Sequence, residues 1–328
     1  MPPAPGPSPY RLDLADVVGP GAIGRIERAG QLRFHCVGDT GGHENPIPQR
    51  AVSAAMATEL TAPAPASFLY HLGDVVYPHG EAAGYESQFI GAYADYDAPI
   101  LGVPGNHDGE VAPGSSARPL DAFAAQFCAP STAIAPEHGR PPQRQPNVHW
   151  TLTHPWVTII GLYTGVPDGG QLDESQRRWL TDELCAARPD VTLLMAMHHP
   201  VFSADTVHGS NLELRDALDT CFARAGRHPD AVLSAHAHNY QRYSRRVEGR
   251  EIPYLVAGSG GFPELHGLGY GVPEPPASFA GLPGVSLEAY RHSTFGFLTV
   301  TASARGARID YNAVVRRRPV LCDTVTLT

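Results

Sequence analysis

The chain has 328 residues, of which 42% are hydrophobic and 17% charged, with 34 glycines and 32 prolines. This composition excludes a disordered chain and is typical of a loop-rich globular protein, long enough for one large domain or two. The formal net charge is −9, and all 24 basic residues are arginines, so we expect no basic face and no nucleic-acid partner.

The cysteines and the N-terminal residues limit the class of protein further. The five cysteines are scattered along the chain without CxxC spacing: Cys36, Cys128, Cys185, Cys221 and Cys322. This pattern indicates core or surface thiols instead of a disulfide framework or a zinc knuckle. The Pro-rich start lacks a signal-peptide pattern, and no stretch approaches the roughly 18 apolar residues of a membrane span. We therefore expect a cytoplasmic protein without a membrane partner.

Short apolar runs recur along the chain, and each is broken by Gly, Pro, Asp or His. They occupy residues 31–40, 66–74, 99–108, 157–165, 191–199, 230–238 and 253–261. Their lengths suit strands that are buried on both faces. Helical patterns cover 174–187, with Asp173 as N-cap and Gln176 completing a capping box, and 211–226, which ends on glycine. Strands that alternate with helices predict an α/β architecture.

The remaining segments define the expected domain organisation. Residues 1–30 are interpreted as an N-terminal tail and lead-in, of which the first ten have no evident means of packing. Residues 31–328 are expected to form a single domain. The Pro-, Gly- and Ala-rich segment 109–148 is interpreted as an insertion or lid over one edge. Alternation around an Arg-Gly turn in 295–315 predicts a β-hairpin that closes the sheet.

Polar residues gather where five of the apolar runs stop. The sequences are VGDTGG with Asp39, LGDVVY with Asp74 and Tyr77, PGNHD with Asn106 and His107, MHHP with His198 and His199, and SAHAHNYQR with His236 and His238. Each residue alone is explained by a turn, a helix cap or a satisfied core group. Because the carboxyl ends of strands meet at one edge of an α/β sheet, their joint occurrence predicts a single site.

The types of residue at these strand ends indicate metal chemistry. Aspartate, asparagine and histidine form a hard, mixed oxygen and nitrogen donor set, too large for one tetrahedral ion. On an extended segment, His236 and His238 would project to the same side and serve neighbouring ions. Two ions about 3.5–4 Å apart are a known device for in-line displacement at phosphorus. The sequence therefore predicts a dinuclear phosphoesterase site.

The ordered motifs DTG, GDVVY, GNHD, MHHP and AHAHNYQR closely resemble those of the calcineurin-like metallophosphoesterases. Within that family, the tyrosine of GDVVY, the HNYQR continuation and the later YLVAGSGG are similar to the purple acid phosphatases in their compact single-domain form. The resemblance runs from residue 33 to about residue 262. It implies a four-layer αββα sandwich of two mixed sheets flanked by helices, with the metal site at the C-terminal ends of the strands.

The resemblance also implies two sets of metal ligands that share one carboxylate. The first metal would be held by Asp39, Tyr77 and His238, and the second by Asn106, His198 and His236, with Asp74 bridging both. His107 is similar to the family histidine that contacts the phosphate and assists the leaving group. His208 is placed near another substrate-facing histidine of the family, although its local sequence differs. His199 is interpreted as a wall or supporting residue, and Ala235 replaces the usual glycine of the last motif.

Tyr77 bears on the identity of the metals. A phenol has a pKa near 10, so binding as phenolate requires a strong Lewis acid. Fe(III) beside a second divalent ion (Fe, Zn or Mn) meets that demand. A metal-activated hydroxide would then attack phosphorus in line, with His107 protonating the departing alkoxide. We expect the protein to hydrolyse phosphate monoesters with an optimum at acidic pH. If Tyr77 only packs beside the strand end, the protein would be an ordinary divalent-metal phosphoesterase.

Other functions remain open at the level of the sequence. The same core serves phosphodiesterases and nucleotidases, for instance those acting on cyclic nucleotides, and a phosphatase dedicated to a biosynthetic intermediate is a further alternative. A non-catalytic phosphate-binding protein is a third possibility, although the motifs are intact. The substrate is expected to be a small-molecule phosphoester. Groups near the strand-end loops that would recognise it are His43, His79, Tyr163, Tyr240 and Arg242. The family is often exported, and the motifs specify no oligomeric state.

Overall fold

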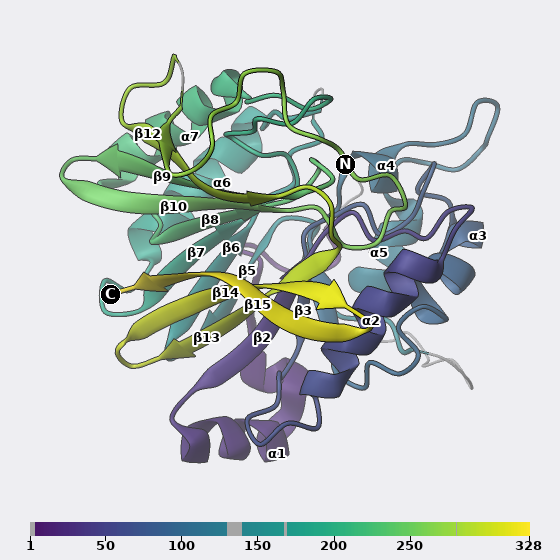
Figure 1. Ribbon diagram of the computed structural model, residues 1–328. Coiled ribbons are helices and arrows are strands. Elements are labelled where there is room, and N and C mark those ends of the chain that lie inside the picture. Colours follow the sequence, from purple (N-terminus) through teal and green to yellow (C-terminus); the bar gives the residue numbers. More distant parts are fainter. Residues whose placement is uncertain (1–3, 130–139, 167–168, 280) are drawn as a thin grey trace.

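Two mixed β-sheets face each other, and helices flank them (Figure 1). The computed structural model describes residues 4–129, 140–166, 169–279 and 281–328. The larger sheet has nine strands in the spatial order β1 (Arg11–Asp13), β5 (Trp150–His154), β6 (Val157–Gly161), β7 (Thr192–Ala196), β8 (Ala231–Ser234), β10 (Arg250–Ala257), β9 (Tyr240–Val247), β12 (Val285–Arg291) and β11 (Ala277–Ser278). The smaller sheet has six, in the order β15 (Arg318–Leu327), β14 (Gly306–Val315), β13 (Gly296–Ser303), β2 (Leu32–Val37), β3 (Leu69–His71) and β4 (Ile100–Gly102).

The helices divide between the two sheets. They are α1 (Leu14–Ala29), α2 (Ile47–Glu59), α3 (Ala82–Tyr85) with its π-helical continuation η1 (Glu86–Ile90), α4 (Asn106–Gly109), α5 (Asp121–Phe127), α6 (Glu174–Ala186) and α7 (Leu212–Ala225). α6 and α7 share one hydrophobic cluster with the larger sheet, and α2, η1 and α5 share another with the smaller sheet. The expected two-sheet α/β sandwich is therefore confirmed. Within the described residues, no helix combines the length and apolarity needed to cross a membrane.

The core between the sheets combines many aliphatic side chains with a few stacked aromatic ones. Tyr70 of β3 and Trp150 of β5 stack with ring centroids 5.8 Å apart, and Tyr240 of β9 stacks on Tyr311 of β14 at 3.8 Å. All four rings are buried. Large rings that reach across the interface remove much apolar area from water, so they hold the strand ends of the two sheets in a fixed relation.

An ion pair also joins the two sheets. Asp323 of β15 receives Arg242 Nε at 2.7 Å, Arg242 Nη2 at 3.0 Å and the Tyr240 hydroxyl at 2.7 Å. Arg242 and Tyr240 lie on β9 of the other sheet. The expectation that these two residues recognise substrate is wrong, because their polar groups are used in this inter-sheet contact.

The two predicted helices form, with one difference at a cap. Asp173 accepts the backbone N–H of Gln176 at 2.8 Å, as expected for an N-cap. The Gln176 side chain turns away from the cap and exchanges two hydrogen bonds of 2.8 Å with the backbone of Tyr163. The reciprocal half of the predicted capping box is therefore absent at this helix. Gly226 ends α7 in the left-handed conformation, with φ of 61°.

The N-terminal residues belong to the fold. β1 pairs in parallel with β5, α1 follows it, and Trp179 Nε1 donates to the Pro9 carbonyl at 2.7 Å. The ring of Tyr10 lies against His149, with centroids 5.4 Å apart. The expectation that residues 1–10 cannot pack is wrong for this part of the segment, and residues 1–3 lie outside the described residues. The helix is hard to recognise because Gly19, with φ of 75°, kinks it in the middle of its apolar pattern.

Two other segments can be compared with their predictions. In the described part of 109–148, α5 packs on the smaller sheet and the Gln145 side chain exchanges hydrogen bonds of 2.7 and 2.9 Å with the backbone of Gly102 on β4. Residues 130–139 of the proposed lid lie outside the described residues. The predicted hairpin in 295–315 is β13 and β14, which pair antiparallel, and β15 extends the same sheet.

Candidate metal centre

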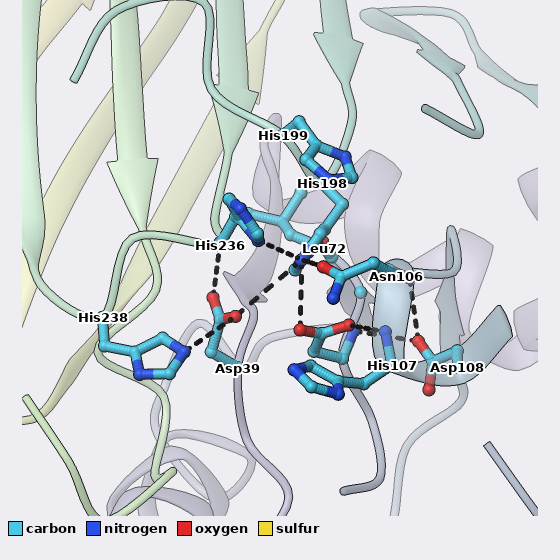
Figure 2. A network of polar contacts seen from close by, with 12 residues as sticks. Asp39, Leu72, Asn106, His107, Asp108, His198, His199, His236 and His238 are labelled. Carbon is cyan, nitrogen blue, oxygen red and sulfur yellow. Dashed lines mark hydrogen bonds and ion pairs between the residues drawn. The ribbon is translucent and has the colours of Figure 1, made fainter. Parts of the chain in front are cut away.

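The strand-end residues come together in one place, but from both sheets. Parallel strands β2, β3 and β4 of the smaller sheet and β7 and β8 of the larger sheet end beside each other. Figure 2 shows Asp39, Asn106, His198, His236 and His238 pointing toward a common point. The predicted convergence is confirmed. The strand ends belong to two sheets, however, and not to the single sheet edge that the sequence suggested. The two sheets pack so that the carboxyl ends of these strands lie beside each other.

Asp39, Tyr77 and His238 form one group of donor atoms. The Tyr77 hydroxyl donates to Asp39 Oδ1 at 3.1 Å and lies 3.4 Å from His238 Nε2. His238 Nε2 lies 3.6 Å from the same Asp39 oxygen. The Tyr77 ring packs between His107 and Phe262, with centroids 4.4 and 4.2 Å away. Tyr77 thus packs through its ring while its hydroxyl faces the site. The two interpretations of Tyr77, as a packing residue and as a metal ligand, each agree with part of these contacts.

A second group adjoins the first through Asp74. One ligand atom each from Asp74, His198 and His236 lies within 4.8 Å of the others. His198 Nε2 is 3.2 Å from Asp74 Oδ2 and 3.2 Å from Asn106 Oδ1. The Tyr77 hydroxyl donates to the same Asp74 oxygen at 3.1 Å. The donor atoms therefore form two adjoining sets, with Asp74 between them.

Tight turns aim the side chains of these loops. Asp39 and Asp74 both have φ of 55°, and His236 has φ of 68°, a left-handed backbone that is uncommon outside glycine. The 235–238 segment is a series of tight turns, with Ala237 N–H donating to the Ala235 carbonyl at 2.8 Å. The expectation of an extended segment is wrong. His236 and His238 nevertheless reach different donor groups, because the turns separate their rings.

Ala235 fits where the family usually has glycine. A Cβ atom on Gly38 would lie 2.4 Å from the Ala235 methyl group. Gly38 therefore leaves the space that the Ala235 methyl group occupies, so the extra methyl group does not displace the turn.

Further groups fix the orientation of the donors, and sequence reasoning did not identify them. Asp108 is fully buried and accepts the backbone N–H groups of Asp74, Val75 and Gly105 at 2.9, 3.0 and 2.9 Å. His198 Nδ1 lies 2.9 Å from the Leu72 carbonyl, and His238 Nδ1 lies 3.0 Å from that of Glu264. A carbonyl can only accept, so both Nδ1 atoms carry protons, and in the neutral form of each ring Nε2 is the nitrogen that can bind a metal. The aspartate of GNHD was the available signal for Asp108.

The electrostatics of the site favour a bound cation. Burial raises the pKa of Asp39 and of the Tyr77 phenol, and the two carboxylates raise the Tyr77 pKa further. Burial alone would raise the pKa of Asp74, but His198 holds it below its usual range. Burial alone would lower the pKa of His198, but Asp74 raises it to about 9. No described arginine pairs with either carboxylate, so the donor set suits metal ions.

Two further histidines border the donor groups. His107 Nδ1 lies 2.8 Å from the Pro78 carbonyl, so it carries a proton, and the His107 backbone N–H donates to Asp74 Oδ1 at 2.9 Å. The ring of His208 lies 3.9 Å from that of His236 by centroid distance. The structure therefore brings both of these sequence-predicted residues next to the donors.

A cavity of about 860 Å³ opens beside the donors. Its described walls include Asn106, His236, His199, His208, Glu110, Tyr163 and Glu213. His199 is buried and joins the wall, in agreement with its sequence interpretation. Of the other recognition candidates, Tyr163 lines the cavity, whereas His43 and His79 are not among its described lining residues.

Comparison with known proteins identifies the class. A sequence model described as calcineurin-like phosphoesterase matches residues 32–240. Tartrate-resistant acid phosphatase type 5 of Homo sapiens is 30% identical over 250 residues, which cover 70% of this chain and 73% of that protein. The chain therefore belongs to the calcineurin-like phosphoesterase family. It is a metallophosphoesterase of the purple acid phosphatase type.

Two other similarities cover less of the relatives. The cAMP/cGMP dual specificity phosphodiesterase MT0825 of Mycobacterium tuberculosis is 35% identical over 103 residues, which are 31% of each chain. The structure of purple acid phosphatase PPD1 from yellow lupin (Lupinus luteus) superposes with a TM-score of 0.66 at 16% identity, over 91% of this chain and 54% of that one. This chain thus spans about a third of the phosphodiesterase and about half of the lupin enzyme.

Proposed function

We propose that this metal-dependent phosphoesterase is a phosphatase that hydrolyses small-molecule phosphate monoesters in the manner of the purple acid phosphatases. The observation that carries the proposal is the position of the Tyr77 hydroxyl, 3.1 Å from carboxylate oxygens of both Asp39 and Asp74. A phenol at the junction of two buried carboxylates is suited to a trivalent ion beside a divalent one, because its deprotonation requires a strong Lewis acid.

The donor atoms can be divided between two ions. In the proposed assignment, Asp39, Tyr77 and His238 hold Fe(III); Asn106, His198 and His236 hold a divalent Fe, Zn or Mn ion; and Asp74 bridges the two. The 3.1–3.6 Å separations within the first group support this division, since ligands about 2.1 Å from one ion lie roughly 3 Å apart when adjacent. When bound, such ions supply Lewis acidity for the phosphoryl oxygens and an activated water.

The residues around the donors have separate tasks in the proposed reaction. His107 has its Nδ1 proton committed to the Pro78 carbonyl, so Nε2 is the nitrogen that can give a proton to the leaving oxygen. His208 lies over His236 on the cavity side and can donate to a phosphoryl oxygen. Glu110 Oε2 lies 3.4 Å from His107 Nδ1 and so places a carboxylate beside this ring.

A comparison of rates tests the proposal. The metal-loaded protein should hydrolyse phenyl phosphate with a kcat/KM at least 100-fold above that for diphenyl phosphate. His107→Asn should lower kcat about 100-fold on the monoester, the ordinary size of a general-acid contribution. Equal or greater activity on the diester would overturn the monoesterase assignment. Full metal loading without turnover of either compound would favour a phosphate-binding protein.

A phosphodiesterase is the second candidate. It is supported by the similarity to the mycobacterial cAMP/cGMP phosphodiesterase, which extends over 103 residues, and by the cavity of about 860 Å³, which has room for a second ester group. Hydrolysis of cyclic AMP faster than phenyl phosphate would favour this candidate. The position of Tyr77 favours the monoesterase.

A further inference from the structure

The cavity wall carries a tyrosine hydroxyl that makes no side-chain hydrogen bond to a described residue. Tyr163 is 4% exposed, lines the cavity, and has its backbone fixed by two hydrogen bonds to Gln176. A Cβ atom added to Gly109 would lie 2.7 Å from the Tyr163 hydroxyl oxygen, and one added to Gly165 would lie 2.4 Å from it. The absence of side chains at these two glycines therefore leaves room for the hydroxyl. A tyrosine hydroxyl can donate one hydrogen bond and accept others, and here the cavity is the place where a ligand could provide a partner.

The wall also holds a histidine that Thr164 anchors. The Thr164 hydroxyl oxygen accepts the backbone N–H of His199 at 3.3 Å and lies 2.7 Å from His199 Nδ1. A hydroxyl has one proton and two acceptor lone pairs, so Thr164 can donate to Nδ1 or accept from it, and when it donates the proton of the neutral ring lies on Nε2. His199 is 6% exposed and lines the cavity together with Gly169, the residue that its Nε2 approaches. Nε2 can thus act as a second uncharged donor when Thr164 donates to Nδ1.

The carboxylates of the described cavity wall have no arginine beside them in that wall. Glu110 and Glu213 belong to the described lining, and no arginine does. Glu110 is tied to the strand-end residues, with Oε1 accepting from Asn106 Nδ2 at 3.3 Å. Glu213 lies on the first turn of α7 and accepts from Gln171 Nε2 at 3.4 Å. A second anionic group on a substrate would meet these carboxylates without an arginine to pair with.

These features together define what the alcohol part of the substrate must offer. We propose that the cavity selects phosphate monoesters of uncharged polyhydroxy compounds, such as polyols or sugars, with Tyr163 and His199 donating to substrate hydroxyl oxygens, and discriminates against substrates that carry a second anion. This inference rests on the proposed monoesterase function. It adds the class of the alcohol and assigns Tyr163, His199 and Glu213 as specificity-determining residues.

A matched pair of substrates tests the charge selection. Glycerol 3-phosphate and 3-phosphoglycerate differ only in an uncharged hydroxymethyl group against a carboxylate. We expect kcat/KM to be at least tenfold higher for glycerol 3-phosphate, and Glu213→Gln to reduce that ratio about threefold. Glu251→Gln, an exposed residue at the start of β10, is the control and should leave the ratio unchanged. Equal rates on the two substrates, or a ratio that Glu213→Gln does not reduce, would overturn the charge selection.

Substitutions of the two donors test hydroxyl recognition. Tyr163→Phe and His199→Phe should each lower kcat/KM for glycerol 3-phosphate about fivefold more than for phenyl phosphate, mainly through KM, because each removes one neutral hydrogen bond. His199→Gln can return a donor near Nε2 and should restore part of the loss. Equal losses on both substrates, with reduced metal content, would mean a merely structural role. Failure of the wild-type protein on all monoesters would overturn the proposed function itself, which separates the two failures.

Discussion

The carboxylate of Asp108 holds the backbone of Asp74, accepting its N–H at 2.9 Å. The same carboxylate accepts the N–H groups of Val75 and Gly105, so three donors converge on two oxygens. This relation links the loops after β3 and β4, which supply Asp74 and Asn106. The geometry of the proposed bridging ligand therefore depends on a residue that need not touch a metal itself.

Asp108→Asn should weaken metal binding while leaving every donor atom in place. The amide replaces one acceptor oxygen with an N–H₂ group that faces a backbone N–H, so the Asp74 turn loses its support. We expect metal affinity to fall 10–100-fold and the free energy of unfolding by about 2 kcal/mol. Metal titration and urea unfolding measure the two effects. Asp121→Asn, on an exposed residue paired with Arg118, is the control. Unchanged metal affinity in Asp108→Asn would show that Asp74 does not need this support.

Tyr77→Phe should abolish colour without unfolding the protein. If Tyr77 binds Fe(III) as phenolate, concentrated protein as purified will show a visible charge-transfer band, and the variant will lack it. The ring should stay in place because it packs between His107 and Phe262. Absorption spectra of the two proteins, normalised to iron content, provide the measurement.

The control for this spectrum is Tyr70→Phe, which removes another buried hydroxyl, on a ring that stacks on Trp150 in the core. It should keep the band. A band that persists in Tyr77→Phe would assign the colour to another group. Colourless wild-type protein with two divalent metals per chain would make Tyr77 a packing residue and would direct the next assays to diesters.

The candidate site was largely predictable from the sequence because its residues directly follow apolar runs. The carboxyl end of a buried strand is recognisable from a local pattern, so Asp39 and His198 could be placed without knowing how the sheets pack. That the strand ends belong to two sheets does not follow from these local patterns and was implied only by the family resemblance, because strand order depends on pairing between distant residues, such as β2 with β13. The left-handed backbone at His236 was not predicted either, because in a sequence such a conformation is normally indicated by glycine.

The N-terminal residues illustrate a different limit. β1 has only three residues, and its pairing with β5 depends on a partner about 140 positions away. The Gly-Pro step inside α1 resembles a loop signal, yet the helix continues across the kink. Supporting residues such as Thr164 carry no motif, because their role exists only once His199 is 2.7 Å away.

Arg242→Met should destabilise the protein without changing its chemistry. The substitution keeps the apolar stem but leaves Asp323, which is 16% exposed, with only the Tyr240 hydroxyl. Because this removes one partner of a largely buried pair, we expect a loss of about 2 kcal/mol in the free energy of unfolding, with kcat per folded molecule unchanged. Arg308→Met breaks the pair of Asp310 with an arginine whose side chain is 51% exposed, and should cost less than about 1 kcal/mol. A loss in Arg242→Met no larger than that of the control would show that the inter-sheet ion pair contributes little.

His149 should make the folded state sensitive to acid. Its ring packs edge-on against Trp179, and burial lowers its pKa from 6.5 to about 4. Between pH 6.5 and about pH 4, His149 is protonated in the unfolded chain but neutral in the folded chain. Protonation then stabilises the unfolded state, so the folded state loses stability as the pH falls through this window. From pH 7 to pH 5 this contribution is about 2 kcal/mol. His149→Phe keeps the aromatic contact and should remove that part of the decrease in urea unfolding experiments, whereas His292→Phe, on an exposed residue, should not. An identical decrease in both variants would mean that His149 is already protonated in the folded protein at pH 5.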